Sequence, residues 1–164
     1  MTFLRRYSYL LIALLAIAID QLTKEVAIAS LSMGQAIPVI DGILWWRLAY
    51  NDSAAFSLGF GQTWILAIIS FIAMLATIWY SRKISSRSWQ ITAGVFLGGV
   101  VGNLIDRLTR EPGFGIGHVV DFIQIPFNFP VFNLADTFIF TMASLTVIRV
   151  MRGENVGGLP TKVK

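Results

Sequence analysis

Four apolar stretches alternate with more polar segments along the chain. The two middle stretches, Thr63 to Tyr80 and Ser88 to Ile105, each run for 18 residues without a charged side chain. A helix of about 20 apolar residues crosses the hydrocarbon core of a bilayer. The pattern predicts four membrane-spanning helices at about 7–28, 63–80, 88–107 and 132–150.

The composition supports the same architecture. Hydrophobic residues make up 55% of the 164 residues and the mean hydropathy is +0.70, whereas soluble domains are about 45–50% apolar. We therefore expect an α-helical polytopic membrane protein that forms a single membrane domain over 1–164, with a flexible tail at 153–164. Charges interrupt the first and last spans, at Asp20, Lys24 and Asp136.

Basic residues are distributed unevenly between the two sides that these spans define. Loops rich in Lys and Arg face the cytoplasm by the positive-inside rule. Nine of the 13 Lys and Arg lie at the two chain ends and between the second and third spans, namely Arg5, Arg6, Arg82, Lys83, Arg87, Arg149, Arg152, Lys162 and Lys164. Both termini are therefore expected in the cytoplasm, and the loops 29–62 and 109–130 on the outward side.

Both outward loops contain strand-like sequence. Asp41-Gly42 lies between apolar, aromatic-rich runs, which is a strong hairpin signal. If residues 118–125 are extended, Asp121 shares an apolar face with Ile123. The two loops predict a small outward β-element that rests on the helices and directs Asp121 into a covered region.

Small and polar residues mark the third span. Three glycines recur at every fourth position, at Gly94, Gly98 and Gly102, and predict a smooth ridge for close helix packing. Beyond them, Asn103, Asp106 and Arg107 have spacings that make their side chains neighbours. Spacing alone fits an interfacial cap with a snorkelling arginine as well as it fits a site.

On the first span, Asp20 and Lys24 are four residues apart. An intrahelical ion pair worth ~0.3–0.5 kcal/mol would account for them without any functional role.

Asp121 and Asp136 are the strongest candidates for chemistry, because each lies in apolar sequence. An aspartate at the centre of a membrane helix costs about 2.5–3.5 kcal/mol, and less near the interface. Asn133 lies three residues before Asp136, where it can cap the last span and hydrogen-bond the carboxylate. This pattern favours a site over a chance occurrence.

Two carboxylates in a partly dry site tend to share one proton, so that one acts as base and the other as acid. This arrangement suits hydrolysis of a peptide by an activated water. The chain has no cysteine and one histidine, which argues against a thiol nucleophile, a disulfide or a zinc site. No metal or other cofactor is expected.

Two other functions remain open at this stage. A metal-dependent membrane lipid-head-group transferase would use Asp106, Asp121 and Asp136 as oxygen ligands. A proton-coupled small transporter would use buried carboxylates as relays, although four short spans with the carboxylates on one side make a poor pathway.

Five motifs, in order along nearly the whole chain, resemble the bacterial lipoprotein signal peptidase (signal peptidase II) family. They are Asp20-Gln21-x-x-Lys24, Asn51-x-x-Ala54-Ala55-Phe56, Gly98-Gly99-x-x-Gly102-Asn103-x-x-Asp106-Arg107, Val119-Val120-Asp121-Phe122 and Phe132-Asn133-x-Ala135-Asp136. One departure is Ser53, where the family usually has glycine, and it affects the turn after Asn51.

The resemblance implies an aspartic endopeptidase of the bacterial inner membrane, with its active site on the outward side. Such enzymes cut diacylglyceryl-modified prolipoproteins just before the lipidated lipobox cysteine. Membrane lipid and globomycin-type peptide inhibitors are expected partners, with no nucleic acid, and the protein is expected to be a monomer.

The resemblance also implies residue roles. Asp121 and Asp136 would form the catalytic dyad, and Asp106 would orient neighbouring side chains. Asp20 and Lys24 would support the outer rim. Apart from the resemblance, we infer that the outward hairpin and the segment from Asn51 to Phe60 clamp over the peptide. The residues implied to line the substrate site are Asn51, Asn103, Arg107 and Asn133.

Overall fold

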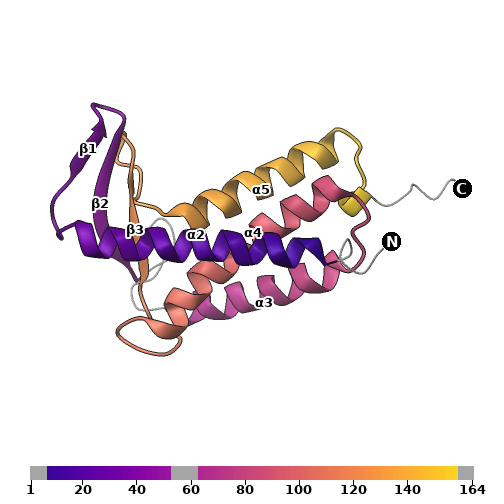
Figure 1. The fold of residues 1–164 in the computed structure, drawn as a ribbon, viewed down its shortest axis with the longest axis horizontal. Helices are drawn as coiled ribbons and strands as arrows, with labels where there is room; N and C mark the ends of the chain where they lie inside the picture. Colours follow the sequence, from indigo (N-terminus) through magenta and orange to yellow (C-terminus); the bar gives the residue numbers. More distant parts are fainter. Residues whose placement is uncertain (1–6, 53–62, 159–164) are drawn as a thin grey trace, which may run out of the picture.

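The computed structural model describes residues 7–52 and 63–158, and within these ranges it contains four long helices and a small sheet (Figure 1). The helices are α2 (Ser8–Ser30), α3 (Thr63–Ser81), α4 (Arg87–Thr109) and α5 (Leu134–Met151). The strands are β1 (Ile37–Ile40), β2 (Leu44–Asn51) and β3 (Val119–Gln124), and a 3-10 helix, η1 (Val156–Gly158), follows α5. The helical architecture and the small β-element are therefore as predicted.

Helix α4 is the central element, because it contacts α2, α3 and α5. A side-chain carbon added at Gly98 would lie 2.4 Å from Cβ of Ala16 on α2, and one added at Gly99 would lie 2.6 Å from the carbonyl oxygen of Ala135 on α5. Both distances are too short for a real side chain. The two glycines thus allow α2 and α5 to approach α4 closely. The approach of α2 at Gly98 is the close packing that the glycine ridge predicted.

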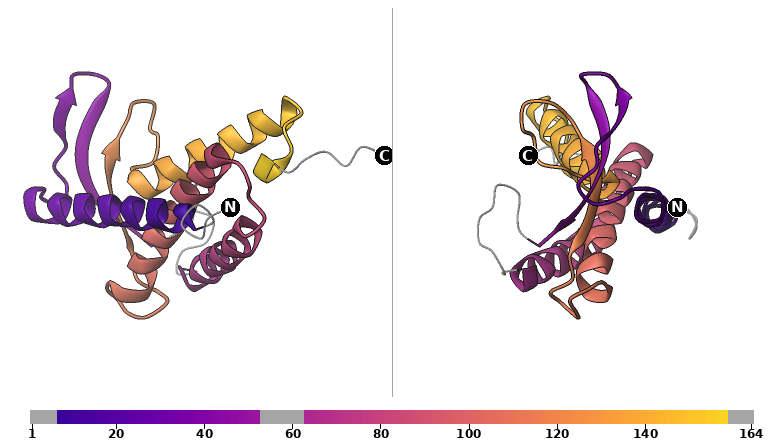
Figure 2. Two further views of the ribbon diagram at one scale, coloured as in Figure 1. Left: turned by 45° about the vertical axis from the view of Figure 1, so that its right-hand side comes forward. Right: turned by 90° about the vertical axis from the view of Figure 1, so that its left-hand side faces the viewer.

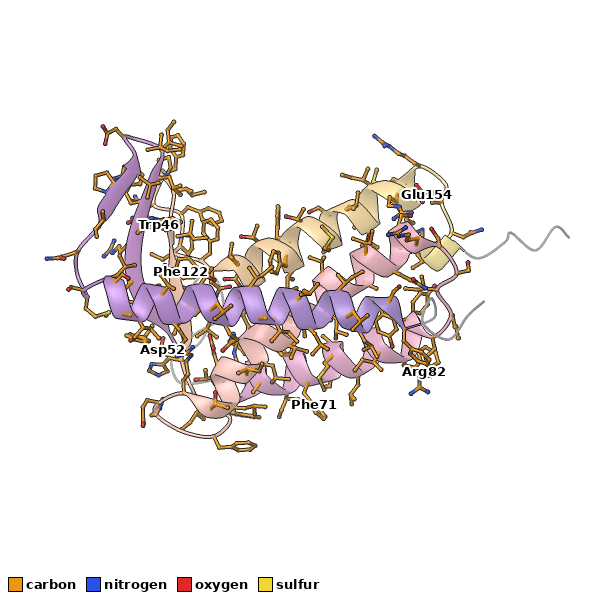
Figure 3. All side chains as sticks on the ribbon, in the orientation of Figure 1. Trp46, Asp52, Phe71, Arg82, Phe122 and Glu154 are labelled. Atoms are coloured by element: carbon orange, nitrogen blue, oxygen red, sulfur yellow. The ribbon has the colours of Figure 1, made fainter. Side chains whose placement is uncertain are left out.

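The outer surfaces of the other three helices are apolar. Leu14 on α2, Ile72 on α3 and Phe140 on α5 are 61%, 59% and 75% exposed, and Phe71 on α3 also points away from the helices (Figure 3). Side chains of this kind suit contact with lipid.

Helices α3, α4 and α5 are each long and apolar enough to cross a membrane. Helix α2 has the same length as α4, 23 residues, but charged residues in its second half interrupt its apolar sequence. The chain is a multi-pass membrane protein by these criteria.

The three strands form an antiparallel sheet in the order β1, β2, β3, at one end of the helices (Figures 1 and 2). The predicted hairpin is present, and its turn at 41–43 connects the paired residues Ile40 and Leu44. Gly42 has a φ of +74° there, a conformation that favours glycine. The rings of Trp46 and Phe122 lie 5.8 Å apart (Figure 3) and anchor the sheet on the second half of α2.

The start of α2 and the end of α5 lie at the opposite end of the helices from the sheet (Figure 1). Here η1 packs on the connection between α3 and α4. The backbone N–H of Ser85 donates to the carbonyl of Gly157 at 3.0 Å, and the hydroxyl of Tyr80 donates to the carbonyl of Val156 at 3.2 Å. The first part of the segment expected as a flexible tail, 153–158, is therefore held by hydrogen bonds, and 159–164 lie outside the described residues.

Candidate active site

Asp121 lies in the middle of β3 and its side chain is almost fully buried, with the residue 1% exposed. Its pairing partner on β2 is Ala49. Asn51, two residues further along the same face of β2, donates from Nδ2 to Oδ2 of Asp121 at 2.8 Å. Oδ1 of Asp121 accepts from Nδ2 of Asn133 at 2.6 Å. Both carboxylate oxygens are thus held by amides from two different parts of the chain.

Asp136 lies in the first turn of α5, and Asn133 caps that helix. The backbone N–H of Asp136 donates to Oδ1 of Asn133 at 2.9 Å, and the backbone N–H of Asn133 donates back to Oδ2 of Asp136 at 3.2 Å. This is the reciprocal capping box. Because Asn133 also donates to Asp121, a single side chain links the two aspartates, which we call the aspartate pair.

Asn103 on α4 joins the same network. Its Nδ2 donates to Oδ1 of Asp136 at 2.7 Å, and its Oδ1 accepts from Nδ2 of Asn133 at 3.2 Å. The aspartate pair therefore receives amide donors from β2, from α4 and from the start of α5.

A group of fully buried charges is bonded directly to Asn103. Nζ of Lys24 lies 2.8 Å from Oδ2 of Asp20 and 2.8 Å from Oδ2 of Asp106, and it donates to Oδ1 of Asn103 at 3.0 Å. The three donors of the ammonium group are thus all used. Asp20, Lys24 and Asp106 are each 0% exposed, and we call them the buried charge cluster. Gly102 makes room for it, because a carbon added there would lie 2.5 Å from Oδ2 of Asp20.

Each carboxylate of the buried charge cluster also holds the backbone beside one member of the aspartate pair. Oδ1 of Asp20 accepts from the backbone N–H of Ala135 at 2.9 Å, and Oδ2 of Asp106 accepts from the backbone N–H of Val120 at 3.2 Å. These two amides belong to the residues that directly precede the aspartate pair. Since Lys24 binds both carboxylates, it connects the two backbone segments that carry the pair.

Two further side chains, to which the sequence assigned no role, bind the carboxylates of the buried charge cluster. Arg110 donates from Nε to Oδ1 of Asp106 at 2.8 Å and from a terminal nitrogen to Glu25 at 2.8 Å. Nε2 of Gln21 lies 3.1 Å from Oδ1 of Asp106 and 3.2 Å from Oδ2 of Asp20. In the sequence, only the i,i+4 spacing of Asp106 and Arg110 indicates that these two side chains form an ion pair.

Arg107 lies one residue after Asp106 and is half-buried. One terminal nitrogen donates to the carbonyl of Asn103 at 3.3 Å. Its Nε is buried and has no hydrogen-bond partner within the described ranges. Arg107 therefore retains donor capacity in the neighbourhood of the aspartate pair.

The environment of Asp121 favours its protonated form. Burial raises the pKa of Asp121 to about 7, and the negative charge of Asp136 adds to this rise. The amides of Asn51 and Asn133 and the positive charge of Lys24 act in the opposite direction, but they do not outweigh the loss of hydration. A substantial fraction of Asp121 is thus protonated at neutral pH.

The structure brings most of the sequence-predicted residues into one connected network. Asp20 and Lys24, implied to support the outer rim, are fully buried and paired with each other. Asp106, implied to orient neighbouring side chains, binds Lys24, Arg110 and the backbone N–H of Val120. Among the described residues, no three acidic, histidine or cysteine side chains gather as metal ligands would, so the oxygen-ligand set of the transferase alternative is not formed.

Fold and site together define a multi-pass membrane protein with linked carboxylates where its helices meet a small sheet. A family model described as "Signal peptidase (SPase) II" matches residues 12–152. The chain belongs to the signal peptidase II family, in agreement with the resemblance of its motifs.

Curated relatives carry the name lipoprotein signal peptidase. The protein from Leifsonia xyli subsp. xyli is 43% identical over 90% of this chain and 68% of its own length. The proteins from Mycobacterium avium and Rhodococcus jostii are 40% and 38% identical, over 88% and 94% of this chain and 79% and 77% of their own lengths.

Two solved structures share the fold, and each is described as a bacterial membrane enzyme determined by the in meso method. The one at 2.3 Å resolution has a TM-score of 0.79 and 26% identity, covering 96% of this chain and 94% of that chain. The one at 1.9 Å has a TM-score of 0.76 and 28% identity, covering 88% and 93%.

Proposed function

We propose that the aspartate pair, Asp121 and Asp136, is the catalytic dyad of an aspartic endopeptidase that removes signal peptides from prolipoproteins. The observation that carries this proposal is the link through Asn133, which binds one carboxylate with its side chain and the other with its backbone. The names of the relatives support prolipoproteins as substrates. By the family resemblance, cleavage falls just before a lipobox cysteine that carries diacylglycerol.

The two carboxylates take different roles because their surroundings differ. Asp121 is buried and its pKa is about 7, so it carries the shared proton and acts as the acid. Asp136 is half-buried, so it remains accessible to water and acts as the base. This division is the one that a pair of carboxylates with different environments supports.

In the first step, Asp136 accepts a proton from water while the water oxygen attacks the scissile carbonyl carbon. Asp121 donates its proton to the carbonyl oxygen, which gives a neutral tetrahedral diol. In the second step, the bond from carbon to nitrogen breaks. Asp136 returns its proton to the leaving amine, and Asp121 recovers a proton from the diol as the new carboxyl group forms.

Two donors beside the dyad suit the binding of an extended peptide. Arg107 has a buried Nε without a hydrogen-bond partner among the described residues, and a substrate carbonyl would satisfy it. Asn51 lies at the end of β2 and would present its amide to the peptide backbone. A globomycin-type cyclic peptide would compete for the same donors. The clamp expected from Asn51 to Phe60 falls mainly outside the described residues.

The position of the site within the fold favours a dyad on the outward side of the membrane. The dyad lies where the sheet meets the helices, and the start of α2 and the end of α5 lie at the other end (Figure 1). In this proposal α2 is the fourth membrane crossing. The positive-inside rule then places both termini in the cytoplasm, and the dyad faces outward in the bacterial inner membrane.

The decisive experiment uses Asp121→Asn and Asp136→Asn, which keep the size of the side chain, remove the titrating group and replace one accepting oxygen with an NH2 donor. Purified protein is incubated in detergent with a diacylglyceryl-modified lipobox peptide, and the lipidated cysteine with a free N-terminus is measured. We expect no cleavage by either variant, normal membrane accumulation of both, and full activity of Asp41→Asn in the exposed hairpin turn. Cleavage by either dyad variant would refute the proposal.

A further inference from the structure

We propose that Arg110 is a positioning residue for the catalytic aspartates and acts on them through Asp106 and Lys24. This inference rests on the proposed function, because it concerns the geometry of the same dyad. Arg110 itself contacts Asp106 and Glu25, and its effect on catalysis is indirect.

The first argument is charge balance. The buried charge cluster contains two carboxylates and one ammonium group, all 0% exposed, and therefore has a net charge of −1. Arg110, whose side chain is 19% exposed, supplies the second positive charge at 2.8 Å from Asp106. An unbalanced charge in a buried site is costly, so Arg110 allows both carboxylates to remain ionised around Lys24.

The second argument is the division of the two oxygens of Asp106. Oδ1 accepts from Arg110 at 2.8 Å and from the amide of Gln21, which leaves Oδ2 to bind Lys24 at 2.8 Å and the backbone N–H of Val120 at 3.2 Å. Without the guanidinium group, Oδ1 loses its charged donor and keeps only the neutral amide of Gln21 at 3.1 Å, so the carboxylate is held less firmly. Lys24 and the backbone before Asp121 would then lose a fixed acceptor.

The third argument is the path from Lys24 to the dyad. Lys24 donates to Oδ1 of Asn103 at 3.0 Å, and Nδ2 of Asn103 donates to Asp136 at 2.7 Å. A shift of Lys24 toward an unbalanced Asp106 would weaken its bond to Asn103. One guanidinium group therefore affects the supports of both catalytic residues.

The backbone holds Arg110 in place for this task. Arg110 follows the last residue of α4, and its N–H donates to the carbonyl of Asp106 at 3.0 Å. The chain then folds back, and the N–H of Gly117 donates to the carbonyl of Arg107 at 3.0 Å. A carbon added at Gly117 would lie 2.4 Å from the carbonyl oxygen of Asp106, so this close return requires glycine. Glu25 on α2 binds the other side of the guanidinium group.

The test is a kinetic comparison of Arg110→Met, Arg110→Lys and the wild type with the diacylglyceryl-modified lipobox peptide. For Arg110→Met we expect kcat to fall by about 10–100-fold, since a misplacement of ~1 Å can cost about 100-fold. KM should change less than about threefold, because Arg110 lies outside the substrate site. Arg110→Lys keeps the charge and should recover most of kcat. Arg152→Met, the same change at the opposite end of the helices, should leave both constants unchanged.

A double-mutant cycle identifies the route of the effect. If Arg110 acts through Asp106, Arg110→Met should lower kcat no further in an Asp106→Asn background. Equal and independent losses in both backgrounds would overturn the inference, as would a wild-type kcat for Arg110→Met or a rise in KM alone. Should Arg110→Met fail to accumulate, a tenfold loss of kcat in Arg110→Lys would overturn it instead. Failure of the wild type to cleave would count against the proposed function, whereas these outcomes concern Arg110 alone.

Discussion

Nδ2 of Asn103 lies 2.7 Å from Oδ1 of Asp136, and Oδ1 of the same amide accepts from Lys24 at 3.0 Å. The second contact determines the first. An ammonium group can only donate, so the oxygen of the Asn103 amide must face Lys24 and its nitrogen must face Asp136. A buried charge on α2 thereby determines which atom α4 presents to the carboxylate of Asp136 on α5.

Asn103→Leu should therefore impair catalysis although Asn103 is not one of the two aspartates. The change removes a donor to Asp136 and leaves a buried donor of Lys24 unpaired. We expect kcat to fall on the order of 100-fold and the free energy of unfolding to fall by about 1–3 kcal/mol. Steady-state cleavage of the lipidated peptide and thermal unfolding in detergent provide the two measurements.

Thr109→Val is the matched control for Asn103→Leu, because Thr109 lies on the same helix and its hydroxyl bonds only the carbonyl of Ile105 in the contacts described. It should retain wild-type kcat. An Asn103→Leu enzyme with kcat within twofold of the wild type would show that Asp136 does not depend on this amide.

Peptidase activity should decrease as the pH rises through about 7. The pKa of Asp121 is raised to about 7 by burial and by the charge of Asp136, and the proposed mechanism requires Asp121 to be protonated. The alkaline limb of the profile of kcat/KM against pH reports this group in the free enzyme. A profile that stays flat from pH 6 to pH 9 would assign the shared proton elsewhere.

The same group makes stability depend on pH, with a defined sign. A carboxyl whose pKa is higher in the folded protein contributes stability that is complete below its unfolded pKa, about 3.9, and is lost as the pH rises through about 7. Between pH 4 and pH 8 the wild type should therefore lose stability relative to Asp121→Asn, by on the order of 4 kcal/mol. Thermal unfolding of both proteins across this range measures the difference, and parallel curves would contradict it.

The sequence reveals the aspartate pair but hides the cluster that supports it. Asp121 and Asp136 are conspicuous because a carboxylate in apolar sequence is costly. Asp20 and Lys24 have the spacing of an ordinary surface ion pair, and the sequence offers no sign that Asp106, far along the chain, binds the same ammonium group. Pairing within a helix can be read from spacing, whereas burial depends on which helices meet.

The helices and the hairpin are predictable for a related reason. Each depends on a local pattern, either a long apolar run or Asp41-Gly42 between strand-like segments. The position of β3 beside β2 is not local, since it depends on the contacts of Trp46 with Phe122 and of both with α2. The role of Asn51 accordingly followed from family resemblance, and its contact with Asp121 became visible only in three dimensions.

Removal of divalent cations should leave cleavage unchanged. Asp121 and Asp136 are held by side-chain amides, and the proposed steps move protons between these carboxylates, water and the peptide. Dialysis of the enzyme against EDTA, followed by the lipidated-peptide assay, tests this expectation. Loss of activity that Mg²⁺ restores would instead favour a metal-dependent head-group transferase.

The fourth membrane crossing and the outward position of the sheet can be tested together by labelling introduced cysteines, because the chain has none of its own. In intact spheroplasts, a membrane-impermeant maleimide should label Asp41→Cys in the hairpin turn. It should label Thr2→Cys, Arg82→Cys and Glu154→Cys only after permeabilisation. Arg82 and Glu154 lie at the end of the helices away from Trp46 and Asp52 (Figure 3). A single placement of the protein in the bilayer therefore accounts for the labelling expected at Asp41, Arg82 and Glu154. Labelling of Thr2→Cys from outside would mean that α2 does not cross the bilayer.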